Sequence, residues 1–231
     1  MSEPVALPRA ERMAIEGPAG ALEALVETPP AEADEPHTVA AFGVVCHPHP
    51  LYGGTLDNKV VYTLARAFQQ RGAPVIRFNF RGVGESGGSH DEGRGEAADA
   101  LAVIDWGRRR WPQAALWLAG FSFGGVVAVR IAARARAVRL VAVAPGINKL
   151  DPAGAEPPLC PWLIVQGDAD DVVPPAAVLG WARALEAAPG VRPPVVQVLR
   201  GGGHYFHGRI NELREVVLGF MEAADSAAAA V

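Results

Sequence analysis

The fold follows from one short segment, Leu116-Trp117-Leu118-Ala119-Gly120-Phe121-Ser122-Phe123-Gly124-Gly125. It predicts a short buried strand, a tight turn that carries Ser122, and a helix from Val126 to Ala135. A serine on such a sharp turn has strained backbone angles, and only small neighbours such as Gly120 and Gly124 let the two chain segments pass. The turn would lift the hydroxyl above the sheet, beside the first N–H groups of the helix. The alternative is a plain strand, turn and helix with a surface serine.

The rest of the chain alternates strands and helices around this segment. This alternation implies right-handed crossovers, so we predict an α/β fold with a mostly parallel sheet of about eight strands and helices on both faces. Besides the serine strand, we predict strands over Arg12–Ile15, Leu22–Glu27, Val39–Cys46, Val75–Phe80, Val138–Ala144, Trp162–Val165 and Val195–Leu199, and helices over Asn58–Arg71, Gly95–Arg110, Pro175–Ala188 and Ile210–Ala224.

Length and composition limit the class of protein. A chain of 231 residues with 50% hydrophobic and 20% charged residues can bury a full core, and we expect one domain, with a lead-in over 1–38 and a frayed tail over 225–231. The net charge of −4 gives no basic surface for nucleic acid. The acidic N-terminus and the lack of a long apolar run predict a cytoplasmic protein without a membrane partner. Cys46 and Cys160 are expected at opposite edges of the sheet, as two reduced thiols.

Several loops that follow strands carry groups suited to acyl transfer. In an open parallel sheet, these loops meet in the crevice at the carboxyl ends of the strands. Ser122 is the candidate nucleophile, and His204, which follows a strand and three glycines, is the candidate general base. The acid that orients the imidazole is one of three aspartates after the preceding strand, Asp168, Asp170 and Asp171.

The motifs and their order resemble those of the α/β-hydrolase superfamily. Gly120–Gly124 is similar to its nucleophile elbow, Gly167–Pro174 to its acid loop, Gly203-His204 to its histidine loop, and Arg81–Ser86 to a turn that many members carry. The resemblance covers about residues 39–222 and implies the α/β-hydrolase fold. Its acid-loop pattern Gly-x-x-Asp-x-x-Val-Pro falls on Gly167, Asp170, Val173 and Pro174, which implies that Asp170 is the acid. Asp168 and Asp171 are then expected to cap turns.

Within the superfamily, the run His-Pro-His-Pro-Leu-Tyr-Gly-Gly resembles a compact group similar to esterases and dienelactone hydrolases. The connection 145–161 is short and contains five prolines, so we predict no cap domain.

An oxyanion hole requires two backbone donors. One is the N–H of Phe123, directly after the serine. The second is expected from the loop after Cys46, where proline lacks an N–H, which leaves His49, Leu51 or Tyr52. The resemblance to the His-Gly-Phe-Pro-Leu loop of related hydrolases implies His49. The side chain of His47 is expected to hydrogen bond to the backbone of this loop.

Two other kinds of site are weaker interpretations. His47, His49, His204, His207 and Asp170 could bind a metal ion, but two of these are needed for acyl transfer and no further ligand arrives from a matching loop. The glycine-rich loop 82–87 matches G-x-G-x-x-G, but glycine, serine and acidic residues follow it where a dinucleotide site needs a helix. We therefore expect no metal and no cofactor.

The prediction is a serine hydrolase that acts on a small ester or related acyl compound through an acyl-enzyme. A peptidase or a C–C bond hydrolase with the same residues is the alternative enzyme. A non-catalytic binding protein of the same fold is an alternative of another class, since fold does not determine function. The sequence predicts a small-molecule partner and leaves the substrate and the oligomeric state open.

Overall fold

The computed structural model describes residues 9–29, 39–152 and 156–229. Its strands are β1 (Arg9–Gly17), β2 (Gly20–Thr28), β3 (Ala41–Cys46), β4 (Val75–Phe78), β5 (Ala115–Phe121), β6 (Arg139–Val143), β7 (Trp162–Gly167) and β8 (Val195–Leu199). These described strands form one eight-stranded sheet in the order β1-β2-β4-β3-β5-β6-β7-β8. Strands β1 and β2 form a hairpin closed at Gly17 and Gly20, and β2 runs antiparallel to β4. All other neighbours are parallel, so the predicted mostly parallel sheet is confirmed.

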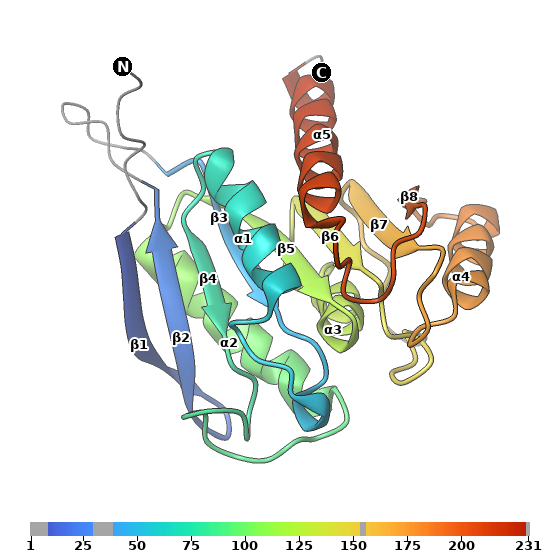
Figure 1. Ribbon diagram of the computed structural model, residues 1–231. Coiled ribbons are helices and arrows are strands. Elements are labelled where there is room, and N and C mark those ends of the chain that lie inside the picture. Colours follow the sequence, from blue (N-terminus) through green and yellow to red (C-terminus); the bar gives the residue numbers. More distant parts are fainter. Residues whose placement is uncertain (1–8, 30–38, 153–155, 230–231) are drawn as a thin grey trace, which may run out of the picture.

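Helices cover both faces of this sheet (Figure 1). They are α1 (Lys59–Gln70), α2 (Arg94–Arg110), α3 (Phe123–Ile131), α4 (Pro175–Ala187) and α5 (Ile210–Ala229), with a short 3-10 helix η1 (Pro50–Tyr52). Helices α1 and α5 pack on one face, and α2, α3 and α4 pack on the other. Successive residues of β3 point to opposite faces of the sheet. Val44 packs in the core beneath α2, α3 and α4, and Val45 packs in the core beneath α1 and α5. Both faces are therefore buried, as the apolar run in β3 predicts.

Several element boundaries differ from the predictions, and the structure gives the reason for those of α3 and β4. Helix α3 begins at Phe123 rather than Val126, because Ser122 is itself the cap and its carbonyl accepts from Gly125 and Val126. It ends at Ile131, and Arg136 takes a left-handed φ of 48° in the turns that follow. Strand β4 ends at Phe78 instead of Phe80, because the N–H of Phe80 donates to the His47 ring.

Helix α5 continues through the predicted frayed tail to Ala229, because alanine is the strongest helix former. Residues 1–8 and 30–38 of the lead-in, and 230–231 of the tail, lie outside the described residues.

The connection between β6 and β7 contains no helix in its described residues, 144–152 and 156–161, which agrees with the predicted lack of a cap. No helix in the described part of the chain has the length and apolar character needed to cross a membrane. Cys46 and Cys160 are buried free thiols, and burial raises the pKa of Cys160 to about 11. They lie at the carboxyl end of β3 and before the amino end of β7, as predicted.

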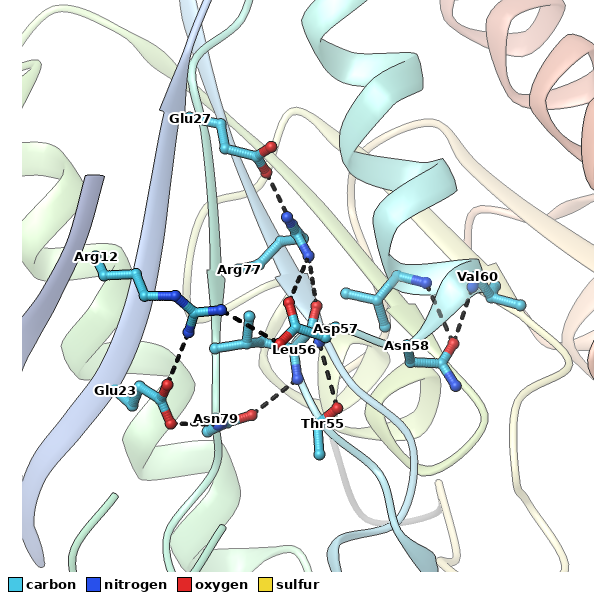
Figure 2. Close-up of polar contacts among 11 residues, drawn as sticks. Arg12, Glu23, Glu27, Thr55, Leu56, Asp57, Asn58, Val60, Arg77 and Asn79 are labelled. Carbon is cyan, nitrogen blue, oxygen red and sulfur yellow. Dashed lines mark hydrogen bonds and ion pairs between the residues drawn. The ribbon is translucent and has the colours of Figure 1, made fainter. Parts of the chain in front are cut away.

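A buried polar cluster fixes the loop between η1 and α1 to the sheet (Figure 2). Arg77 on β4 donates to Glu27 on β2 at 2.8 Å and to the carbonyl of Leu56 at 2.7 Å. The side chains of Arg77 and Glu27 are only 4% and 7% exposed, so Glu27 places a negative charge beside the buried guanidinium. The Arg77 guanidinium also lies 3.6 Å from Asp57. The loop is thereby held against β4.

A second set of contacts in the same region ties this loop to the one that follows β4. Asn79 accepts from the N–H of Leu56 at 2.8 Å and donates to Glu23 at 2.7 Å. Glu23 also accepts from the backbone of Glu85 at 3.1 Å and pairs with Arg12 at 2.8 Å. The two loops on this side of the sheet therefore have a fixed relative position.

Candidate active site

Ser122 lies on the sharp turn between β5 and α3. Its φ of 54° is strained for a residue with a side chain. The turn is held in this conformation by its own backbone, since the N–H of Ser122 donates to the carbonyl of Val143 at 2.9 Å. A Cβ on Gly120 would lie 2.1 Å from the carbonyl oxygen of Gly124, and a Cβ on Gly124 would lie 2.3 Å from that of His47. Both positions therefore require glycine, for the reason that the sequence motif indicates.

The loop after β7 and the loop after β8 are joined by their backbones. The N–H of Ala169 donates to the carbonyl of Gly202 at 3.0 Å, and a Cβ on Gly167 would lie 2.0 Å from the same oxygen. This close approach carries Asp170 and His204 toward each other at the carboxyl edge of the sheet. The two loops form one unit beside Ser122.

Ser122, His204 and Asp170 form a continuous hydrogen-bonded chain. His204 Nε2 lies 3.1 Å from Ser122 Oγ, and His204 Nδ1 lies 2.8 Å from Asp170 Oδ2. The side chains of His204 and Asp170 are 3% and 0% exposed. A carboxylate in this position keeps the proton on Nδ1, so Nε2 can accept the hydroxyl proton. The arrangement can generate an alkoxide-like nucleophile at neutral pH.

Asp170 is held in place by more donors than the sequence indicates. Its Oδ1 accepts from the N–H groups of Val172 and Val173 at 2.9 and 2.8 Å. Its Oδ2 also accepts from the buried amide of Gln166 at 3.0 Å. Burial alone would raise the pKa of Asp170, but hydrogen bonds from His204 and these backbone donors outweigh it and lower the pKa. The carboxylate is therefore ionised at neutral pH.

Asp168 does not reach this chain of hydrogen bonds. Its Oδ1 accepts from the N–H of Gly201 at 2.6 Å and fixes the turn before His204. This is the capping role that the sequence predicts for it. Asp171 is exposed beside Asp170.

His47 is completely buried and fixes the loop after β3. Its Nε2 accepts from the N–H of Phe80 at 2.9 Å, so Nδ1 carries the proton and donates to the carbonyl of Pro48 at 2.6 Å. Burial lowers the pKa of His47 to about 4, with the charge of His49 adding to the effect. Both ring nitrogens are occupied by backbone, as predicted. Within the described residues, no three His, Cys, Asp or Glu side chains come together as a metal site.

The buried neutral imidazole predicts a specific pH dependence of stability. In the folded state the pKa of His47 is about 4 instead of the ordinary 6.5, so the imidazole stays unprotonated as the pH falls between these values. In the unfolded chain the same imidazole takes up a proton over that range. The unfolded state then binds more protons, so stability falls as the pH falls. Between pH 7 and 5 this group should remove about 2 kcal/mol from the free energy of unfolding.

His47→Gln should lose this contribution, so its free energy of unfolding should change by about 2 kcal/mol less between pH 7 and 5. Urea unfolding at both pH values measures the difference. His207→Gln, at an exposed position, is the control and should keep the wild-type dependence. A His47→Gln variant with the wild-type dependence would show that the imidazole titrates normally.

The loop that follows His47 presents backbone donors beside the serine. Of the three possible second donors, Leu51 donates to the His49 ring at 3.2 Å and Tyr52 donates to the His49 carbonyl at 3.1 Å. No acceptor among the described residues takes the N–H of His49 or of Phe123. Both residues line the same cavity as Ser122. Two unused donors in such a place can stabilise an oxyanion.

A histidine and a glutamate that sequence reasoning missed lie behind these donors. The ring of His90 lies 4.9 Å from that of His49 and 5.7 Å from that of Phe123. His90 Nδ1 is 2.7 Å from Glu96, whose fully buried carboxylate also accepts from Gly93 at 2.8 Å. The sequence does not indicate this pair, because His90 lies in a loop and Glu96 in the first turn of α2, and no known motif joins them.

The glycine-rich loop after β4 has a structural role rather than a nucleotide-binding geometry. Arg81 forms a two-pronged pair with the buried Asp99, at 3.0 and 2.7 Å, and Ser86 bonds to the backbone of Glu23 and Asn79. Helix α2 opens only at Arg94, well beyond the glycines. The loop therefore lacks the helix that a dinucleotide site places directly after its glycines.

A cavity of about 460 Å³ opens over Ser122 and His204. Its walls come from the loop after β3, the turn after β6 and the loop after β7, with Tyr205 beside the histidine. The exposed side chains of Tyr52, Val172 and Tyr205 make its mouth largely apolar. Its volume suits a small organic molecule.

Sheet order, the serine turn after β5 and the histidine and aspartate of the two later loops together define the class of protein, an α/β-hydrolase. A family model described as alpha/beta hydrolase fold matches residues 44–158. The chain belongs to the α/β-hydrolase fold family.

Relatives match nearly the whole chain. RP471 of Rickettsia prowazekii (strain Madrid E) is 34% identical over 87% of this chain and 84% of its own length. XC6422 of Xanthomonas campestris, described as an α/β serine hydrolase without lid, is 37% identical over 96% of this chain and 97% of its own, with a TM-score of 0.84. An α/β serine hydrolase homologue from Coxiella burnetii is 41% identical over 90% of this chain and 95% of its own, with a TM-score of 0.81. These similarities support hydrolase activity for this chain.

Proposed function

We propose that this chain is a serine hydrolase that cleaves small esters. The observation that carries the proposal is the hydrogen-bonded chain from Ser122 through His204 to the buried Asp170, at the floor of an open cavity. The similarity to serine hydrolases supports the reaction type. The run His-Pro-His-Pro-Leu-Tyr-Gly-Gly supports placing the chain among compact, esterase-like members.

The proposed reaction begins when Ser122 Oγ attacks the acyl carbon and its proton passes to His204 Nε2. Asp170 stabilises the imidazolium that forms and keeps its orientation. The N–H groups of Phe123 and His49 stabilise the negative charge on the carbonyl oxygen. His204 then protonates the departing alcohol, which leaves an ester on Ser122. A water molecule, deprotonated by His204, releases the acid and restores the serine.

The open cavity favours short acyl chains. No cap helix arises from the described residues between β6 and β7, so little apolar wall is available to enclose a long chain. Each methylene that stays in water forfeits about 0.8 kcal/mol of binding. Among p-nitrophenyl esters of graded length, we expect kcat/KM to be highest for short acyl groups and to show no rise above the micelle concentration of the longer esters.

Steady-state rates of p-nitrophenol release across this series test the proposal. A rate that increases steadily to long chains, or that jumps when the ester forms micelles, would contradict the assignment to small substrates.

A further inference from the structure

One charged side chain in the cavity has no part in the proposed reaction. Lys149 lines the cavity together with Ser122 and His204, and the described lining contains no Asp or Glu side chain. Within the described residues, no carboxylate forms a salt bridge with its ammonium group. The group lies 6.0 Å from the centre of the Tyr52 ring, at the mouth of the cavity. The cavity therefore contains a cation without a counter-ion from the described chain.

The backbone around Lys149 is fixed to the catalytic region. Ala144, directly after β6, has a strained φ of 41°, which turns the chain toward the serine. The N–H of Gly146 donates to the Ser122 carbonyl at 2.9 Å, and a Cβ on Gly146 would lie 3.2 Å from the Phe123 nitrogen. The N–H of Lys149 then donates to Gly146 at 2.9 Å.

The same turn is attached on its other side to the acid loop. The side chain of Asn148 donates to the carbonyl of Val172 at 3.0 Å. Lys149 therefore extends from a tight turn that is bonded both to the residue before the helix and to the loop of Asp170. Such a turn holds the base of the lysine in a constant position relative to Ser122.

We propose that Lys149 binds an anionic group of the substrate, so that the site acts preferentially on small esters that carry a carboxylate. This inference rests on the proposed function and specifies its substrate class. A carboxylate that enters the cavity would meet one ammonium group and no described acidic side chain in the walls. A charge-assisted hydrogen bond to an ammonium group in a partly apolar site is stronger than one between neutral groups.

Two further observations agree with Lys149 as the cation of the site. Lys149 and Lys59 are the two lysines of a chain that has 21 basic residues, so a lysine here does not follow from general composition. Burial, with the charges of His90 and Lys149, lowers the pKa of His49. The neighbouring imidazole is therefore neutral at pH 7 and does not replace the lysine.

Matched ester pairs test the inference. 4-Acetoxybenzoate and its methyl ester place the charge, or a neutral equivalent, on the alcohol part of the substrate. Monomethyl and dimethyl glutarate do the same on the acyl part. The readout is the ratio of kcat/KM for the charged ester to that for the neutral ester, measured for the wild-type protein, Lys149→Met, Lys149→Arg and Lys59→Met.

We expect Lys149→Met to lower this ratio by about tenfold in at least one pair, and Lys149→Arg to retain most of it, because only the charge is essential. Lys59→Met should keep the wild-type ratio, because Lys59 does not line the cavity. The wild-type ratio should also fall as ionic strength rises. If the wild-type protein prefers the charged ester in the first pair, Lys149 binds an anion on the alcohol side of the substrate. If it prefers the charged ester in the second pair, Lys149 binds an anion on the acyl side.

A ratio that Lys149→Met leaves unchanged in both pairs, in a protein that does hydrolyse the neutral esters, would overturn the role of Lys149 and leave the proposed function intact. A protein that hydrolyses none of the four esters and resists labelling at Ser122 would overturn both. Thermal melting of each variant verifies that the exposed substitutions leave the fold unchanged.

Discussion

Ser122→Ala should lower the rate of ester hydrolysis by roughly 10³-fold or more, with the fold retained. The alanine cannot form the acyl-enzyme, so only the oxyanion donors and substrate binding remain. The substitution removes a single oxygen whose partner, His204 Nε2, lies 3.1 Å away at the floor of an open cavity. The strained backbone at this position stays the same, and the free energy of unfolding should change by less than about 1 kcal/mol.

Steady-state kinetics with a short p-nitrophenyl ester and a urea unfolding curve measure the two quantities. Ser89→Ala is the control, because Ser89 is an exposed serine of the loop before α2. It should keep wild-type kinetics. Full activity in Ser122→Ala would place the nucleophile elsewhere in the chain.

Asp170→Asn should lower kcat by a factor on the order of 10²–10⁴. The orientation of the new amide is already determined, because Oδ1 accepts from the N–H groups of Val172 and Val173 and must remain an oxygen. The amide nitrogen therefore replaces Oδ2 and faces His204 Nδ1. A donor in that position favours the tautomer with its proton on Nε2, which cannot accept the proton of Ser122.

Asp168→Asn and Asp171→Asn are matched controls from the same loop and should keep most activity. Asp168 accepts a hydrogen bond from the N–H of Gly201, and the amide oxygen of an asparagine can accept the same bond. If Asp168→Asn were the damaging change and Asp170→Asn a mild one, the assignment of the acid would be wrong.

The sequence predicts the parts of this protein in which local geometry restricts the choice of residue. Gly120 and Gly124 are required because a Cβ at either position would overlap a carbonyl oxygen, and this restriction is visible as a motif. Gly167, which abuts Gly202, marks the acid loop in the same way. The mostly parallel character of the sheet follows from alternating elements and right-handed crossovers.

Other parts depend on contacts between distant segments, and the sequence does not reveal them. Gln166 lies just after the predicted strand Trp162–Val165, and nothing in the sequence indicates that the fold brings its amide to Asp170. His90 lies in the loop before α2 and Glu96 in the first turn of that helix, and only the structure shows that the pair lies beside His49. The predicted start of α3 at Val126 is wrong, because the glycines of its first turn resemble a loop, whereas Ser122 caps the helix through its carbonyl.

Labelling with a fluorophosphonate tests the central proposal most directly, because the reagent reacts with a serine only when a neighbouring base activates it. Mass spectrometry of the digested protein should locate one phosphonyl group on Ser122 in the wild-type protein. Ser122→Ala should remain unlabelled, and Asp170→Asn should react much more slowly. A folded wild-type protein that stays unlabelled, or a label on another residue, would contradict the account.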